Sequence, residues 1–224
     1  MNESGVFTIT NNYLNANQLS QSYWGYNTFQ YALGITFFSR LEVNYICTIV
    51  DGKKKNKNSI MFNQDRHFSA KVLALKEGEI WSWTPSIALG ISDPVTGSGT
   101  GEYIGSDVSG DTYTQNGFFN RFYIVATKHF NTSIGQVGAH LGYQYSLRKE
   151  RPINAPCAAV TWCPVWLHNR WFDPKFILEY DSRTPNIGFI ADIWDDRFEA
   201  MFELQNFQWI SFGLRFKLKL KGSE

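Results

Sequence analysis

The sequence predicts an all-β fold, a transmembrane antiparallel up-and-down β-barrel of about twelve strands. Three observations lead to this prediction. Apolar and polar residues alternate along most of the chain, which is the period of a strand with two different faces. We expect most of the strands to run about nine to thirteen residues, as a tilted membrane strand requires, whereas strands of soluble sheets usually have about five or six. All the long connections except Pro164–Phe172 also gather at one end of the predicted barrel.

The composition agrees with a barrel and excludes other classes. The 224 residues are 43% hydrophobic, 17% aromatic and 18% charged, with a formal net charge of +1. A near-neutral chain lacks the basic footprint of a nucleic-acid-binding protein. No run approaches the roughly 18 apolar residues of a transmembrane helix. A mean hydropathy of −0.28 is then the average of one apolar face and one polar face.

The alternation defines the strands in chain order. Phe29–Phe37 and Leu41–Ile49 are the clearest, and a short turn joins them into a hairpin. Phe122–His129 carries bulky apolar residues on both faces, so its inward side stays open. Cys157–Cys163 alternates weakly and should end at Pro164. The other predicted strands are Val6–Thr10, Phe68–Ala74, Ser86–Ser92, Val137–Tyr145, Lys175–Asp181, Ile187–Ile193, Phe198–Leu204 and Phe212–Leu220.

The connections sort into two sets. One end carries the longest predicted loops, Asn11–Tyr23, Lys53–Gln64, Asp93–Gly117 and Arg148–Ala155, together with the short connections Ser182–Pro185 and Gln205–Phe207. The other end carries Ser39–Arg40, Lys76–Ile80, Asn131–Ser133, Pro164–Phe172 and Trp194–Asp196. Bacterial barrels place long loops outside the cell and short turns in the periplasm, so we expect an outer-membrane location with both termini periplasmic. We expect residues 1–221 to form one barrel domain and interpret Gly222–Glu224 as an added tail that breaks the last strand's pattern.

Several segments resemble one family in their order along the chain. They are YNTFQYALGITFFSRLEVNYICT (Tyr26–Thr48), NQDRHFSAKVLALKEGE (Asn63–Glu79), SIALGISD (Ser86–Asp93), NRFYIVATKHF (Asn120–Phe130), GQVGAHLGYQY (Gly135–Tyr145) and LEYDSRTPNIG (Leu178–Gly188). With GVFTITNNYL near the N-terminus, the chain is similar to the YjbH-like outer-membrane proteins. The resemblance implies a barrel associated with the production or export of a surface polysaccharide. It supplies no catalytic motif that transfers residue by residue.

A charged wall is predicted inside the last four strands. Its members occupy the alternate strand positions that are expected to point into the lumen: Glu179, Asp181, Asp192, Glu199 and Glu203, followed by Arg215, Lys217 and Lys219. One interpretation is a lumen wall that guides a polar or charged solute. The other is an internal ion-pair network that fills a narrow barrel, since buried charges must be paired. A barrel of about twelve strands is intermediate in size between filled eight-stranded barrels and open porins. The number of strands therefore does not decide between these two interpretations.

Further polar candidates lie elsewhere in the predicted lumen and on a loop. His140 has inward parity between Gln136 and Gln144, which suggests a polar ladder, and Lys71 is also expected to point inward. Barrel hydrolases use a histidine with a serine or carboxylate, but no hydrolase signature accompanies His140. An external basic loop carries Lys53, Lys54, Lys55 and Lys57, which could bind lipopolysaccharide phosphates or anionic polysaccharide.

Three functions remain open from the sequence. The first is a non-enzymatic outer-membrane barrel that supports exopolysaccharide biogenesis or export. The second is a small porin-like diffusion channel for polar solutes, and the third is an outer-membrane enzyme acting on lipid or envelope substrates. We expect no cofactor and no metal, because Cys47, Cys157 and Cys163 lack any metal-site spacing. The expected partners are outer-membrane lipid and lipopolysaccharide, with polysaccharide or envelope assembly proteins, and no nucleic acid.

Overall fold

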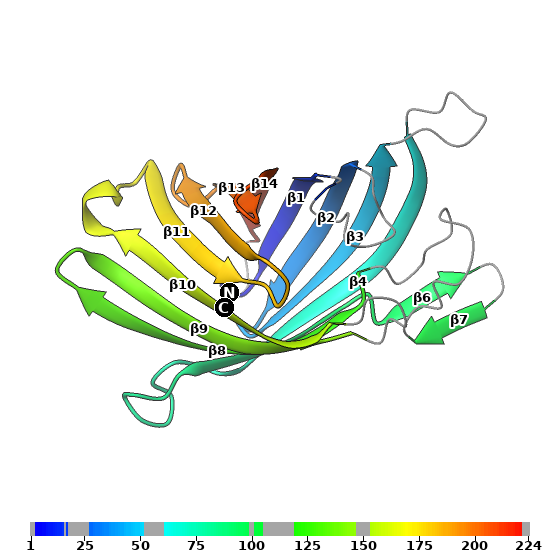
Figure 1. Cartoon of the computed structure of the whole chain (residues 1–224). Helices are drawn as coiled ribbons and strands as arrows, with labels where there is room; N and C mark the ends of the chain where they lie inside the picture. The colour runs from blue at the N-terminus through cyan, green and yellow to red at the C-terminus, as the bar shows by residue number, and fades with distance from the viewer. Residues whose placement is uncertain are drawn as a thin grey trace.

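The computed structural model describes residues 3–15, 17, 27–51, 61–98, 101–104, 119–146 and 153–220. Twelve of its strands close into an antiparallel barrel (Figure 1), which confirms the predicted fold and strand number. The barrel strands are β1 (Val6–Leu14), β2 (Asn27–Phe37), β3 (Leu41–Asp51), β4 (Met61–Leu75), β5 (Ser86–Ser92), β8 (Arg121–Thr132), β9 (Gly135–Tyr145), β10 (Asn154–Pro164), β11 (Phe172–Tyr180), β12 (Pro185–Ile193), β13 (Phe198–Gln205) and β14 (Trp209–Lys219).

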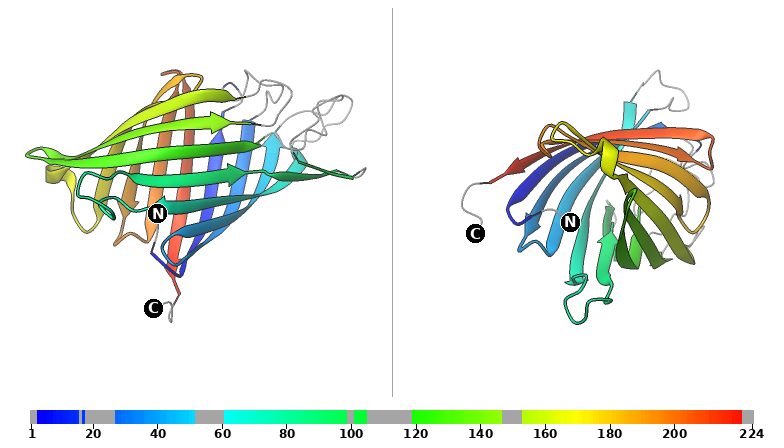
Figure 2. Two further views of the ribbon diagram at one scale, coloured as in Figure 1. Left: turned by 90° about the horizontal axis from the view of Figure 1, so that it is seen from below. Right: turned by 90° about the vertical axis from the view of Figure 1, so that its left-hand side faces the viewer.

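Each barrel strand pairs with its neighbour in sequence, and β1 pairs with β14 to close the barrel. Figure 2 shows the strands wrapping in this order from blue β1 to red β14. The pair β6 (Val95–Ser98) and β7 (Gly101–Ile104) forms a separate hairpin away from the barrel wall. The sequence did not predict it, because this segment lacks the apolar alternation of a wall strand. Among the described residues, no helix is long and apolar enough to span a membrane.

The barrel is apolar outside and polar inside. Large apolar side chains are exposed on the wall, with Leu141 66% and Leu214 62% accessible. Among the described residues, the buried hydrophobic ones are Val6, Ile153 and Ala191, while inward-facing threonines and other polar residues are buried. A water-soluble protein buries its large aliphatic residues, so this distribution is the inverse of a soluble core. It is the distribution of a wall with lipid outside and water inside.

Several predicted boundaries were wrong. β1 continues to Leu14 and β4 begins at Met61, so both flanking loops are shorter than predicted. The connection from β4 to β5 runs from Lys76 to Pro85, beyond its predicted end at Ile80. The first hairpin turn begins at Phe38, because Phe38 and Ser39 both adopt positive φ, as tight hairpin turns require.

The connections after β2, β4, β8, β10 and β12 and the two ends of the described chain lie at the same end of the barrel, which we call the turn end. The Gly5 N–H donates to Thr36 O (2.8 Å), and the Leu220 N–H donates to Gly5 O (2.9 Å). Exposed tryptophans gather on the connections at this end: Trp81, Trp83, Trp166, Trp171 and Trp194. Trp81 and Trp83 stack with their ring centroids 5.5 Å apart. Such a belt is typical of a membrane–water interface.

Candidate functional site

The candidate site is a cavity of about 620 Å³ in the lumen, near the end that carries the long loops. Strands from all around the barrel line it. The polar and charged side chains on its wall include Gln30, Glu42, Asn44, Ser69, Lys71, Arg121, Tyr123, Glu179 and Glu203. A space of this size and polarity can hold a small hydrated or hydroxyl-rich solute.

Small residues let larger polar side chains lie flat against the wall. Gly90 on β5 pairs with Tyr123 on β8, and a Cβ built on Gly90 would lie 1.9 Å from Tyr123 Cζ. Gly34 on β2 likewise pairs with Asn44 on β3, and a Cβ built on Gly34 would lie 2.2 Å from Asn44 Oδ1. These glycines therefore leave space for Tyr123 and Asn44 beside the cavity.

Residues just before β8 also fold into the cavity wall. The Phe119 ring stacks on buried His67, with centroids 5.2 Å apart and planes inclined by 19°. Asn120 Nδ2 donates to Asp93 O (2.9 Å), and Ser146 Oγ donates to Asn120 Oδ1 (3.4 Å). The sequence did not reveal these contacts, because residues 119 and 120 follow a loop with no strand pattern.

The predicted charged wall divides into two parts. The first is an ion-pair network near the turn end, with Lys217 at its centre. Lys217 Nζ lies 2.6 Å from Asp192 Oδ1, 2.5 Å from Asp196 Oδ1 and 2.9 Å from Glu199 Oε2. Arg215 Nη1 lies 2.9 Å from Glu199 Oε1, and its Nε donates to Thr10 Oγ1 (3.1 Å).

The residues of this network lie on the successive strands β12, β13, β14 and β1 or on the turn beside them. The ion pairs therefore run along the wall rather than across the lumen. Lys219 contacts Glu3 at the same end.

The second part lies at the cavity, where Glu179 and Glu203 both line the wall. Glu179 Oε1 accepts a hydrogen bond from Asn186 Nδ2 (3.1 Å). Asp181 also borders the cavity, but its predicted place on a strand was wrong, because β11 ends at Tyr180. Its Oδ1 accepts the backbone N–H groups of Arg183 (3.0 Å) and Thr184 (2.8 Å), so its role is to hold the turn.

The other predicted polar residues form contacts across strands instead of a ladder along β9. His140 Nδ1 and Nε2 lie 2.9 Å from Thr127 Oγ1 and 3.1 Å from Thr161 Oγ1. Gln136 bonds to Asn131, and Gln144 bonds to the Asp181 carbonyl. Lys71 lines the cavity and pairs in register with Glu42, and within the described part of the chain it forms no ion pair. Lys53, Lys54, Lys55, Lys57 and Gly222–Glu224 lie outside the described residues.

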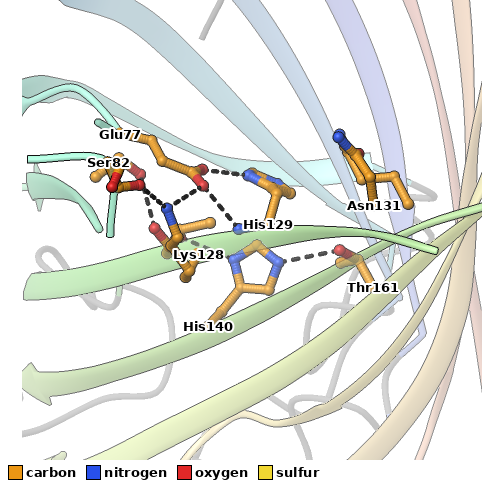
Figure 3. Close-up of polar contacts among 10 residues, drawn as sticks. Glu77, Ser82, Lys128, His129, Asn131, His140 and Thr161 are labelled. Atoms are coloured by element: carbon orange, nitrogen blue, oxygen red, sulfur yellow. Dashed lines mark hydrogen bonds and ion pairs between the residues drawn. The ribbon is translucent and has the colours of Figure 1, made fainter. Parts of the chain in front are cut away.

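A carboxylate–imidazole pair that the sequence did not reveal closes a free strand edge (Figure 3). The pairing of β8 with β5 ends at Thr127 and Ser86, so the last residues of β8 have no partner on β5. Glu77, on the β4–β5 connection, covers this edge. Its Oε1 accepts the His129 N–H (3.1 Å) and its Oε2 lies 2.7 Å from His129 Nδ1. Lys128 Nζ lies 3.0 Å from Glu77 Oε1 and donates to Ser82 O (2.9 Å).

These contacts shift the acidity of Glu77. Burial alone raises the pKa of this carboxyl, but the hydrogen bonds from His129 and Lys128 outweigh it and lower the pKa from 4.5 to about 2. The carboxylate is therefore ionised at neutral pH. No sequence signal pointed to the pair, because Glu77 lies in a turn and the inward face of residues 122–129 could not be assigned.

Neither histidine cluster assembles the groups of a hydrolase. His140 bonds to hydroxyl groups and to no carboxylate, whereas His129 bonds to Glu77 and to no hydroxyl, among the residues that the structure describes. A hydrolytic triad needs a nucleophile, a base and an orienting group together. Within the same ranges, no cluster of three His, Cys, Asp or Glu side chains is arranged to hold a metal ion.

The closed wall, apolar exterior and polar lumen define the architecture of a transmembrane β-barrel. No family model matches the chain, and no curated protein matches it. Among solved structures, the chain is similar to a KdgM porin in complex with disordered oligogalacturonate. The two are 10% identical with a TM-score of 0.51, over 95% of this chain and 99% of that chain. This likeness concerns the fold.

Proposed function

We propose that the protein is a bacterial outer-membrane channel through which small polar solutes diffuse. The observation that carries the proposal is the polar lumen cavity of about 620 Å³. The ion pairs of Lys217 and Arg215 join side chains on the successive strands β12, β13 and β14 and the turn beside them, so they run along the wall and do not bridge the lumen. The porin fold of the similar structure supports the same function.

The outer surface supports the proposed membrane placement. Exposed leucine and phenylalanine side chains face lipid, and the tryptophans of the turn end lie at an interface. With the long loops outside the cell, the turn end and both ends of the described chain face the periplasm. Lipid and lipopolysaccharide are then the partners of the outer wall.

The fold comparison favours a channel over the exopolysaccharide role that the family resemblance implies. A porin needs a lumen that admits solutes and no catalytic group. The geometry of His129 and His140 agrees with a non-enzymatic role, because neither cluster combines a nucleophile, a base and an orienting carboxylate within the described residues.

The test is a recording of purified, refolded protein in a planar lipid bilayer. We expect discrete current steps as single barrels insert, and swelling of proteoliposomes in small neutral sugars. Folding is checked separately by heat-modifiable migration on a gel. Correctly folded barrels that insert but carry no current would overturn the channel.

A further inference from the structure

Most charges of the lumen cavity separate by position around the barrel, and the exceptions are Glu42 beside Lys71 and Arg183 on the connection between β11 and β12. Lys71 on β4 and Arg121 on β8 lie on the two strands that flank β5. Glu179 on β11 and Glu203 on β13 lie on the two strands that flank β12. In the closed strand order, four strands separate β5 from β12 in one direction and six in the other. The basic and acidic groups therefore face one another across the lumen.

The two groups are not neutralised by one another. Neither Lys71 nor Arg121 forms an ion pair with any residue that the structure describes. Glu42 lies beside Lys71 in register and reduces the positive charge of that wall without removing it. On the opposite wall, Glu179 bonds to the neutral amide of Asn186. Asp181 and Arg183 carry opposite charges on that wall and offset one another, so Lys71 and Arg121 on one wall and Glu179 on the other leave a difference in potential across the cavity.

We infer that the lumen prefers small zwitterionic solutes, with an ammonium and a carboxylate on one molecule. This inference rests on the proposed channel function and names its substrate class. A zwitterion can direct its carboxylate toward Lys71 and Arg121 and its ammonium toward Glu179. An anion or a cation of equal size gains at one wall and is repelled at the other.

Three tripeptide derivatives of nearly equal size provide the probes. Triglycine is zwitterionic at pH 7, N-acetyl-triglycine is an anion and triglycine amide is a cation. Each is added to a bilayer with single channels, and its transient block of the ion current is measured. We expect triglycine to block at about two- to five-fold lower concentration than either derivative, the range of partly exposed ion pairs.

Charge variants assign the preference to the two walls. Lys71→Glu and Glu179→Lys should each abolish the preference for triglycine. The double exchange Lys71→Glu/Glu179→Lys should restore the preference, with the positive and negative walls of the cavity interchanged. If a charge-reversal variant does not fold, the neutral variants Lys71→Gln and Glu179→Gln replace it. Lys175→Glu is the matched control, because Lys175 points inward on β11 but does not line the cavity. It should keep the preference.

The outcomes separate the two proposals. Absence of current in the folded wild type would overturn the channel itself. A conducting wild type with equal block by all three probes would overturn only the zwitterion preference. A preference that survives both Lys71→Gln and Glu179→Gln would also overturn it, because the selecting charges would then lie elsewhere.

Discussion

The Glu77 carboxylate accepts hydrogen bonds from both the backbone N–H and the imidazole of His129. The two residues belong to different elements, the β4–β5 connection and the end of β8. An unpaired edge strand is a liability, because its backbone groups lack partners and can pair with other chains. Glu77 therefore completes the barrel at the point where β5 is too short to do so.

Replacing Glu77 by glutamine should destabilise the barrel by about 1–2 kcal/mol, because charge-assisted hydrogen bonds to His129 and Lys128 are lost. The measurement is the urea midpoint for unfolding of the protein in detergent micelles. Glu79→Gln is the control, since Glu79 lies on the same connection and pairs with Arg40 at the exposed surface (2.5 Å). Equal loss in the two variants would contradict a special role for Glu77.

The pH dependence of stability should reveal the same contact. Folding lowers the pKa of Glu77 from 4.5 to about 2, so the folded state favours the ionised carboxylate. Its contribution is fully present above about pH 4.5 and is lost as the pH falls toward about 2. Wild type should therefore lose more stability than Glu77→Gln over this window. Parallel stability curves for the two proteins would disprove the linkage.

Lys217→Met should lower the stability of the barrel much more than Glu77→Gln does. The Lys217 side chain is 8% exposed and contacts three carboxylates, which the substitution leaves without this cation. Removing one partner from a buried ion pair costs roughly 3–5 kcal/mol. The temperature of the heat-modifiable gel shift should fall accordingly. Lys219→Met, at a residue whose side chain is 67% exposed, should leave it nearly unchanged.

Gly90→Ala should narrow the cavity. The added Cβ would occupy the place of the Tyr123 ring, which must then turn toward the lumen. We expect a lower single-channel conductance, with recovery in the double variant Gly90→Ala/Tyr123→Ala. Unchanged conductance in a folded Gly90→Ala protein would show that Tyr123 does not border the conducting path.

Alternation, strand length and the distribution of the long connections together predicted the barrel, and alternation gave its number of strands. It also gave the inward parity of Asp192, Glu199, Arg215 and Lys217, because a strand's two faces follow directly from its residue order. It could not pair these charges, since pairing depends on register between strands. Glu77 and Asp181 show the same limit, because their roles depend on how a turn folds onto a strand end. The β6–β7 hairpin lacks the lipid-facing pattern on which the prediction relied.

The most direct test of the account is thiol modification of single channels. Cys47, Cys157 and Cys163, which form no disulfide, are first replaced by alanine. A cysteine is then placed at Ser69, which lines the cavity, or at its neighbour Phe68, which is 59% exposed on the wall. A bulky, charged, membrane-impermeant thiol reagent should reduce the current of Ser69→Cys and leave that of Phe68→Cys unchanged. Current loss in Phe68→Cys alone, or in neither folded variant, would contradict a conducting path through the polar lumen.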